Sequence, residues 1–167
     1  MLDVVNERLT IEGPHPIAFD SDCREGICGA CGVMINGVAR GPALATATCQ
    51  LHMRFFREGD QILVEPGSAR AFPAINDLVV DRSAFDGIIH AGVRSAPARA
   101  APPDANAILI GKTAVEAAMD AAVCTGCGAC VAVCPNASAS LSFGAKITHL
   151  GDLPHGQPER GRRAYER

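Results

Sequence analysis

The segment CTGCGACVAVCP, residues 124–135, contains four cysteines separated by two, two and three residues, and it ends in a proline. This spacing is typical of loops that bind iron–sulfur clusters, where the first three thiolates bind one cluster and the fourth binds another. Gly126 and Gly128 leave room beside the sulfur atoms, and Pro135 stiffens the exit of the loop. We therefore expect three thiolates around one face of a cubane cluster, with the fourth pointing away from it: Cys124, Cys127, Cys130 and then Cys134.

A second group of cysteines lies nearer the N-terminus. Cys23, Cys28 and Cys31 share one glycine-rich loop, and Cys49 follows after 17 residues. This is the plant-type pattern for a 2Fe–2S cluster, with three ligands in one loop and one remote ligand. The glycines between these cysteines permit sharp turns, and they let backbone N–H groups approach the sulfur atoms. The pattern predicts a 2Fe–2S site formed by these four cysteines.

A Rieske centre, disulfides and a structural zinc site all fit the first cysteine group less well than a 2Fe–2S cluster. A Rieske centre requires paired histidines, but the position two residues after Cys31 is Val33, so His52 stands alone. Disulfides are not favoured, because the N-terminal segment MLDVVNERLTIEG has charges and no apolar core of a signal peptide. Structural zinc prefers two cysteine pairs, and it remains the alternative to the cluster.

The amino-acid composition and charge bear on whether the chain binds nucleic acid. The chain has 167 residues, enough for one ordinary domain or two small ones, and 48% of them are hydrophobic. Its net charge is −3, only 4% of its residues are aromatic and it has no tryptophan. Nothing in this composition argues for a basic patch or for stacking platforms, and we expect no nucleic-acid partner.

The pattern of apolar residues and turn residues predicts the order of the elements. A seam near residues 71–73 separates a strand-containing part, 1–72, from a helical part, 73–167. Between two predicted helices of the second part lies a stretch rich in alanine and proline, 95–107. The predicted elements are a helix over 2–11 ended by Gly13, a strand–turn–strand over 33–38, a strand over 61–65, and helices over 76–89, 113–122 and 137–150.

The order of the two cysteine groups, together with their flanks, resembles the iron–sulfur subunit of succinate dehydrogenase and fumarate reductase. The resemblance extends over nearly the whole chain. It is closest at FDSDCREGICGACGVMINGVARGP (19–42), TCQLHMRFFREGDQILVEP (48–66), FPAINDLVVDRSAFD (72–86), CTGCGACVAVCPNASASL (124–141) and GQPER (156–160).

The resemblance implies an α+β fold in two parts. The first, 1–72, would be a β-grasp domain of the 2Fe–2S ferredoxin type, and the second, 73–167, an α-helical domain of the bacterial ferredoxin type. It also implies three clusters, with Pro135 and Asn136 near the quinone end. The implied ligands are Cys23, Cys28, Cys31 and Cys49 for 2Fe–2S, Cys124, Cys127 and Cys130 for 4Fe–4S, and Cys134 for 3Fe–4S.

The function implied by the resemblance is an electron relay. In that family, electrons pass from an FAD-containing flavoprotein subunit through the three clusters to a quinone at a cytochrome b-type membrane-anchor subunit. The chain would then lie on the cytoplasmic face of the bacterial inner membrane, held there by the anchor. A free-standing soluble ferredoxin is the alternative function, and a zinc-bound or metal-free structural fragment is a third.

The cysteine count adds one further expectation. Four of the eight thiols are assigned to the first group. The remaining four are too few to supply all the ligands of two more clusters. The family has a further strand hairpin before the position of Met1 and further cysteines beyond Arg167. We therefore expect a chain truncated at both ends, with an unpaired sheet edge and a complete ligand set only in the first group.

Overall fold

The computed structural model describes residues 1–92, 106, 110–152, 161 and 165. Contacts divide the chain into two compact units, Met1–Arg82 with Cys127–Ser138, and Ser83–Gly126 with Ala139–Arg167. These units do not coincide with the domain limits predicted above, which remain a prediction. The difference that matters for function is that most of the second cysteine segment folds with the first cysteine group.

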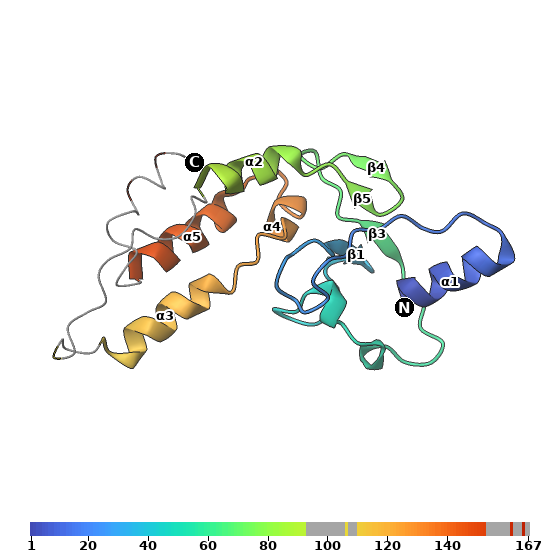
Figure 1. The fold of residues 1–167 in the computed structure, drawn as a ribbon, viewed down its shortest axis with the longest axis horizontal. Coiled ribbons are helices and arrows are strands. Elements are labelled where there is room, and N and C mark those ends of the chain that lie inside the picture. Colours follow the sequence, from blue (N-terminus) through green and yellow to red (C-terminus); the bar gives the residue numbers. More distant parts are fainter. Residues whose placement is uncertain (93–105, 107–109, 153–160, 162–164, 166–167) are drawn as a thin grey trace. The chain divides into compact units, whose positions relative to one another are not determined.

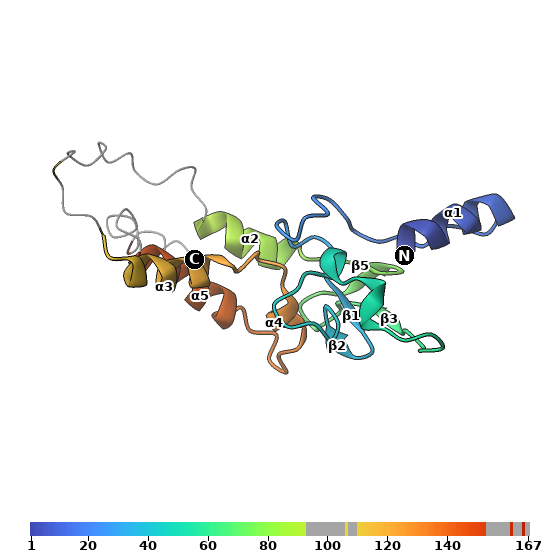
Figure 2. The same ribbon diagram turned by 90° about the horizontal axis from the view of Figure 1, so that it is seen from below.

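The first unit contains a small antiparallel sheet with the strand order β2-β1-β3 (Figures 1 and 2). Strand β1 pairs with both neighbours, and its Val33 and Ile35 are buried in the core of the unit together with Phe72. The elements of this unit are α1 (Leu2–Glu12), β1 (Val33–Ile35), β2 (Val38–Ala39), the 3-10 turns η1 (Thr48–Gln50) and η2 (Met53–Phe55), β3 (Val64–Pro66), β4 (Ala74–Asn76), β5 (Val79–Val80) and α4 (Ala129–Ala132).

The turn between β1 and β2 follows the prediction. Asn36 and Gly37 both have positive φ, 50° and 74°, as a two-residue hairpin turn requires. Asn36 also joins the turn to the segment before β3, because its backbone N–H donates to Leu63 O (2.8 Å) and its Oδ1 accepts from Leu63 N (2.7 Å). The predicted strand over 61–65 forms as β3, which begins only at Val64.

Helix α1 also forms as predicted. It ends at Gly13, which has φ 98° in the left-handed region and donates its N–H to Leu9 O. None of its side chains is buried, and it lies at one end of the first unit. The Asn6 amide fixes it to the returning chain, since its Nδ2 donates to Ile17 O and its Oδ1 accepts from Ile17 N, each at 2.8 Å.

The predicted helix over 76–89 is wrong in its first half. The structure has a hairpin there, with β4 paired to β5, and a helix, α2, begins only at Ser83. Asp77 lies in the turn with φ 47°, a value that helix cannot accommodate. Ala18 holds this turn from outside, because its N–H donates to Asp77 Oδ2 (2.8 Å) and its carbonyl accepts from Leu78 N (3.0 Å).

The second unit is helical. It contains α2 (Ser83–Gly92), α3 (Lys112–Ala122) and α5 (Ser140–Asp152), and α3 packs against α5. Ala118 of α3 and Leu150 of α5 are buried. Helix α5 starts three residues later than predicted, and Ala137, with φ 49°, cannot belong to it.

Within the described ranges, we find no helix with the length and apolar character to cross a membrane. Apart from Asn106, the predicted stretch 95–107 lies outside the described residues.

A close backbone contact beside the sheet gives a stability prediction. A Cβ at Gly67 would stand 2.9 Å from the carbonyl oxygen of Gly32, so one of these two backbone segments would have to move. We expect Gly67→Ala to lower the free energy of unfolding by on the order of 1 kcal/mol. Thermal or urea unfolding of the metal-free chain measures this change.

The control is Gly144→Ala. Gly144 lies in α5, and a Cβ there would meet no atom within 4 Å. Because alanine favours helix over glycine, this variant should be as stable as the native chain or slightly more stable. Equal midpoints for Gly67→Ala and the native chain would contradict the close contact.

Candidate iron–sulfur cluster sites

The first cysteine loop turns its backbone N–H groups toward sulfur. Three of them donate to Cys23 Sγ, from Glu25 and Ile27 at 3.4 Å and from Cys28 at 3.3 Å. A fourth, from Ala30, donates to Cys28 Sγ at 3.4 Å. The loop can close in this way because Gly26 has φ 75°, in the left-handed region. Such N–H groups stabilise thiolates, which is the form that binds metal.

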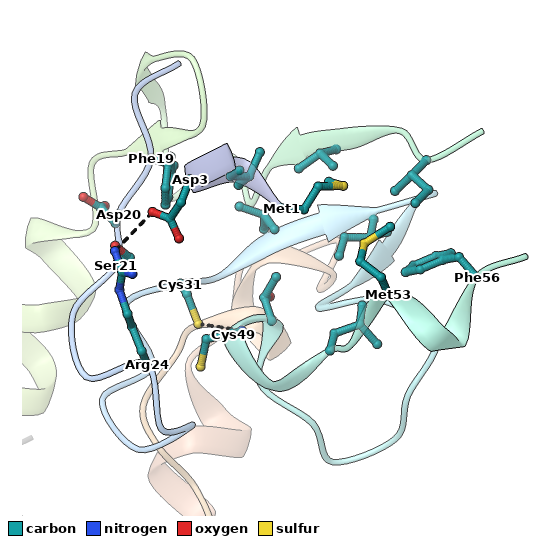
Figure 3. Close-up of a pocket in the computed structure, with 17 residues that line it drawn as sticks. Met1, Asp3, Phe19, Asp20, Ser21, Arg24, Cys31, Cys49, Met53 and Phe56 are labelled. Atoms are coloured by element: carbon teal, nitrogen blue, oxygen red, sulfur yellow. Dashed lines mark hydrogen bonds and ion pairs between the residues drawn. The ribbon is translucent and has the colours of Figure 1, made fainter. Parts of the chain in front are cut away.

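The four cysteines of this group form two pairs. The thiol of Cys28 hydrogen-bonds that of Cys23, and the thiol of Cys49 lies beside that of Cys31. The backbone N–H of Cys49 donates to Cys31 Sγ at 3.4 Å, which Figure 3 shows as a dashed line. Two thiol pairs suit a 2Fe–2S cluster, because that cluster takes four cysteines, two for each iron.

The pKa values of Cys23 and Cys31, one thiol from each pair, are shifted in opposite directions. The N–H groups of Glu25, Cys28 and Ile27 lower the pKa of the Cys23 thiol from the ordinary 9.0 to about 7. Burial raises the pKa of the Cys31 thiol, and the neighbouring Cys49 thiol adds to this increase. Hydrogen bonding therefore favours the thiolate of Cys23, and desolvation opposes ionisation of Cys31.

Gln50 connects the cysteine loop with the remote cysteine. Its Nε2 donates to the carbonyl of Arg24 at 2.7 Å and lies 3.8 Å from Cys49 Sγ. Its Cγ would stand 3.1 Å from a Cβ at Gly26, so the amide lies directly against the loop. This residue was not predicted from the sequence, although its position next to Cys49 is a usable signal.

A cavity of about 220 Å³ adjoins this site (Figure 3). Cys31 and Cys49 line one part of it, and apolar side chains, among them Met53 and Phe56, line another. At its edge Arg24 forms an ion pair with Asp3 at 3.1 Å. Cys31 and Cys49 therefore border a space that is lined mostly by apolar side chains.

The second cysteine group is divided between the compact units. Cys127, Cys130 and Cys134 lie in the first unit, whereas Cys124 is exposed and lies in the second. The N–H of Ala129 donates to Cys127 Sγ at 3.5 Å, and Gly128 before it has φ 76°. The backbone N–H groups of Ser138 and Asn136 lower the pKa of the Cys134 thiol. Cys134 follows α4, and the next helix, α5, begins only at Ser140.

Arg82 contacts both cysteine loops of the first unit. Its Nη1 donates to the carbonyl oxygen of Gly29 and to that of Cys127, each at 3.2 Å. The two bonds join Arg82 to residues that lie 53 positions before it and 45 positions after it in the sequence. Nothing in the spacing of the cysteines indicates this arginine, so it could not be predicted from the sequence.

All eight cysteines are free thiols. In the part of the chain that the structure describes, no three or more His, Cys, Asp or Glu side chains are grouped closely enough to hold a single metal ion. The positive support for a cluster therefore comes from the thiol pairs and from the N–H groups directed at their sulfur atoms.

Comparison with known families agrees with this geometry. The profile of the 2Fe–2S iron–sulfur cluster binding domain matches residues 1–87, slightly more than half of the chain. The chain belongs to the 2Fe–2S iron–sulfur cluster binding domain family. The profile of the 4Fe–4S binding domain matches residues 117–138 of this iron–sulfur protein, which include its second cysteine group. The predicted α+β fold with these two kinds of domain is confirmed.

The relatives of this iron–sulfur protein agree with the resemblance. It is 34% identical over 119 residues to an uncharacterized iron–sulfur protein of Methanocaldococcus jannaschii, covering 71% of this chain and 21% of the relative. It is 27% identical over 154 residues to the succinate dehydrogenase iron–sulfur subunit of Bacillus subtilis, covering 86% of this chain and 53% of that subunit. The chain thus spans about a fifth and about half of these two relatives.

A solved structure shows the same fold. A chain of the Mycobacterium smegmatis Sdh1 complex in the apo form matches with a TM-score of 0.55 and 28% identity. The match covers 80% of this chain and 51% of that chain. The iron–sulfur protein is therefore homologous to the iron–sulfur subunits of succinate dehydrogenase and fumarate reductase.

Proposed function

We propose that this chain relays electrons between an FAD-containing flavoprotein subunit and a quinone, as the iron–sulfur subunit of a succinate dehydrogenase or fumarate reductase. The chain itself performs no succinate–fumarate chemistry; its clusters, when bound, supply one-electron transfer. The proposed domains are 1–72 and 73–167. The proposed ligands are Cys23, Cys28, Cys31 and Cys49 for 2Fe–2S, Cys124, Cys127 and Cys130 for 4Fe–4S, and Cys134 for 3Fe–4S.

One observation supports a relay more than any other. The loop of the first cysteine group and the loop that begins at Cys127 lie against each other in one compact unit. A Cβ at Gly32 would stand 3.4 Å from the Cys127 carbonyl oxygen, so the backbone after Cys31 almost touches the second group. Two redox sites held this closely suit electron transfer from one to the other.

The partners follow from the same proposal. The flavoprotein subunit would supply or accept electrons at the 2Fe–2S cluster, and the quinone would bind near the 3Fe–4S cluster, beside Pro135 and Asn136. A cytochrome b-type membrane-anchor subunit would hold the chain at the cytoplasmic face of the bacterial inner membrane. The name of the related succinate dehydrogenase iron–sulfur subunit of Bacillus subtilis supports the proposed subunit partners.

Cluster content tests the first part of the proposal. The protein, in the full form that its gene encodes, is reconstituted anaerobically with iron and sulfide, and EPR spectra are recorded after stepwise reduction. We expect a 2Fe–2S signal together with a second, cubane-type signal. Detection of a single cluster type would contradict a relay, and stoichiometric zinc without iron would favour the structural alternative.

Co-purification tests the second part. The tagged protein is isolated from membranes of its own host, and bound flavin is measured in the eluate. A relay subunit should retain a flavoprotein partner in stoichiometric amount. A protein that holds its clusters but never associates with a flavoprotein would be a free-standing ferredoxin instead.

A further inference from the structure

We infer that Arg82 is a positioning residue that fixes the separation of the two cysteine loops and places one positive charge beside both. This inference rests on the proposed function only in treating the two loops as redox sites. The contacts themselves lie within one compact unit. They bring together three segments that are far apart in sequence: the first cysteine loop, residue 82 and the second loop.

The hydrogen-bond geometry explains why an arginine is suited to this place. One guanidinium nitrogen, Nη1, has two hydrogens, and it reaches two carbonyl oxygens at 3.2 Å each. The oxygens therefore lie within twice that distance of each other. One belongs to Gly29, between Cys28 and Cys31, and the other to Cys127 itself. A movement of either loop must stretch or break one of these bonds.

Arg82 is also placed to act through its charge. Its side chain is half-buried, and the carbonyl of Gly29 that it binds belongs to a buried residue. The charge is therefore less screened by solvent than that of an exposed arginine. Reduction of a cluster adds a negative charge, and a nearby cation stabilises the reduced form. Arg82 should thus raise the reduction potentials of both cysteine-bound clusters.

Two variants separate geometry from charge. Arg82→Met keeps an unbranched apolar stem but removes the charge and both hydrogen bonds. Arg82→Lys keeps the charge, but an ammonium group on a flexible stem does not reproduce the planar donor arrangement of a guanidinium. Arg54→Met is the control, because Arg54 is exposed in the same compact unit and its loss changes the net charge equally.

The first measurement needs no cluster. Hydrogen–deuterium exchange is followed in the metal-free chain for peptides that cover residues 29–33 and 127–133. Both segments should exchange roughly tenfold faster in Arg82→Met, the factor expected when hydrogen bonds to a charged donor are lost. Arg82→Lys should show a smaller increase in both segments, and Arg54→Met none. Unchanged exchange in either segment, in both Arg82 variants, would overturn the inference.

The second measurement uses the iron-loaded protein in the full form that its gene encodes. The reduction potentials of both clusters should fall in Arg82→Met and change less in Arg82→Lys and Arg54→Met. The magnetic interaction between the reduced clusters, seen as relaxation enhancement in EPR, should weaken in both Arg82 variants. Potentials that shift equally in Arg82→Met and Arg54→Met would overturn the role of the charge. A native protein that binds no iron would instead count against the proposed function. The hydrogen–deuterium exchange experiment would still test whether Arg82 holds the two cysteine loops together.

Discussion

The Cys49→Ala variant is expected to lose the 2Fe–2S cluster completely. Cys49 is the remote member of the first group, and its N–H and thiol both lie beside Cys31. Without it, one iron of the cluster would have a single thiolate from this group instead of two. After anaerobic reconstitution, visible absorption, EPR and the ratio of iron to protein should all show the loss.

The matched control for this variant is Cys134→Ala. It also removes one thiol from the first compact unit, but from the second cysteine group. Its 2Fe–2S signal should equal that of the native chain. If Cys49→Ala retained the full signal, Cys49 would not be a ligand, and the pairing of Cys31 with Cys49 would have no role in cluster binding.

In the reduced, metal-free chain, alkylating reagents are expected to modify Cys23 faster than Cys31 at neutral pH. Three backbone N–H groups lower its pKa to about 7, and its side chain is only half-buried. At pH 7 roughly half of this thiol is thiolate, about fiftyfold more than for a thiol with the ordinary pKa of 9.0. The lower pKa also makes the thiolate about sixfold to tenfold less nucleophilic, so the net advantage in rate is roughly fivefold to eightfold.

The alkylation rates of Cys23 and Cys31 should depend differently on pH. Because the pKa of Cys23 is lowered, its thiolate forms as the pH rises through about 7, and its rate should level off above about pH 8. The pKa of Cys31 is raised, so its rate should still be increasing there. Iodoacetamide labelling with peptide mapping by mass spectrometry follows each cysteine separately. Equal rates for Cys23 and Cys31 at pH 7 would contradict the role of the N–H groups, and Cys23→Ser should remove the fast reaction.

Local structure could be predicted well because its causes are adjacent in sequence. Gly13 ends α1, and Asn36 and Gly37 form the turn after β1. Glycine has no side chain and asparagine has a short polar one, and both therefore tolerate the positive φ angles that these positions require. The hairpin over residues 74–80 could not be predicted in the same way. Its turn at Asp77 is held by Ala18, 59 residues away, and this contact overrides a pattern that suits a helix.

The amino-acid sequence by itself determined the chemistry of this protein: two groups of four thiols, at spacings that place ligands and N–H donors together within short loops. That information is local, because a loop of a few residues can close in only a few ways. Only the tertiary structure decided that Arg82 joins the first cysteine loop to the one that begins at Cys127. Such a contact depends on loop closure over dozens of residues and on the packing of the whole unit, which no spacing of cysteines encodes.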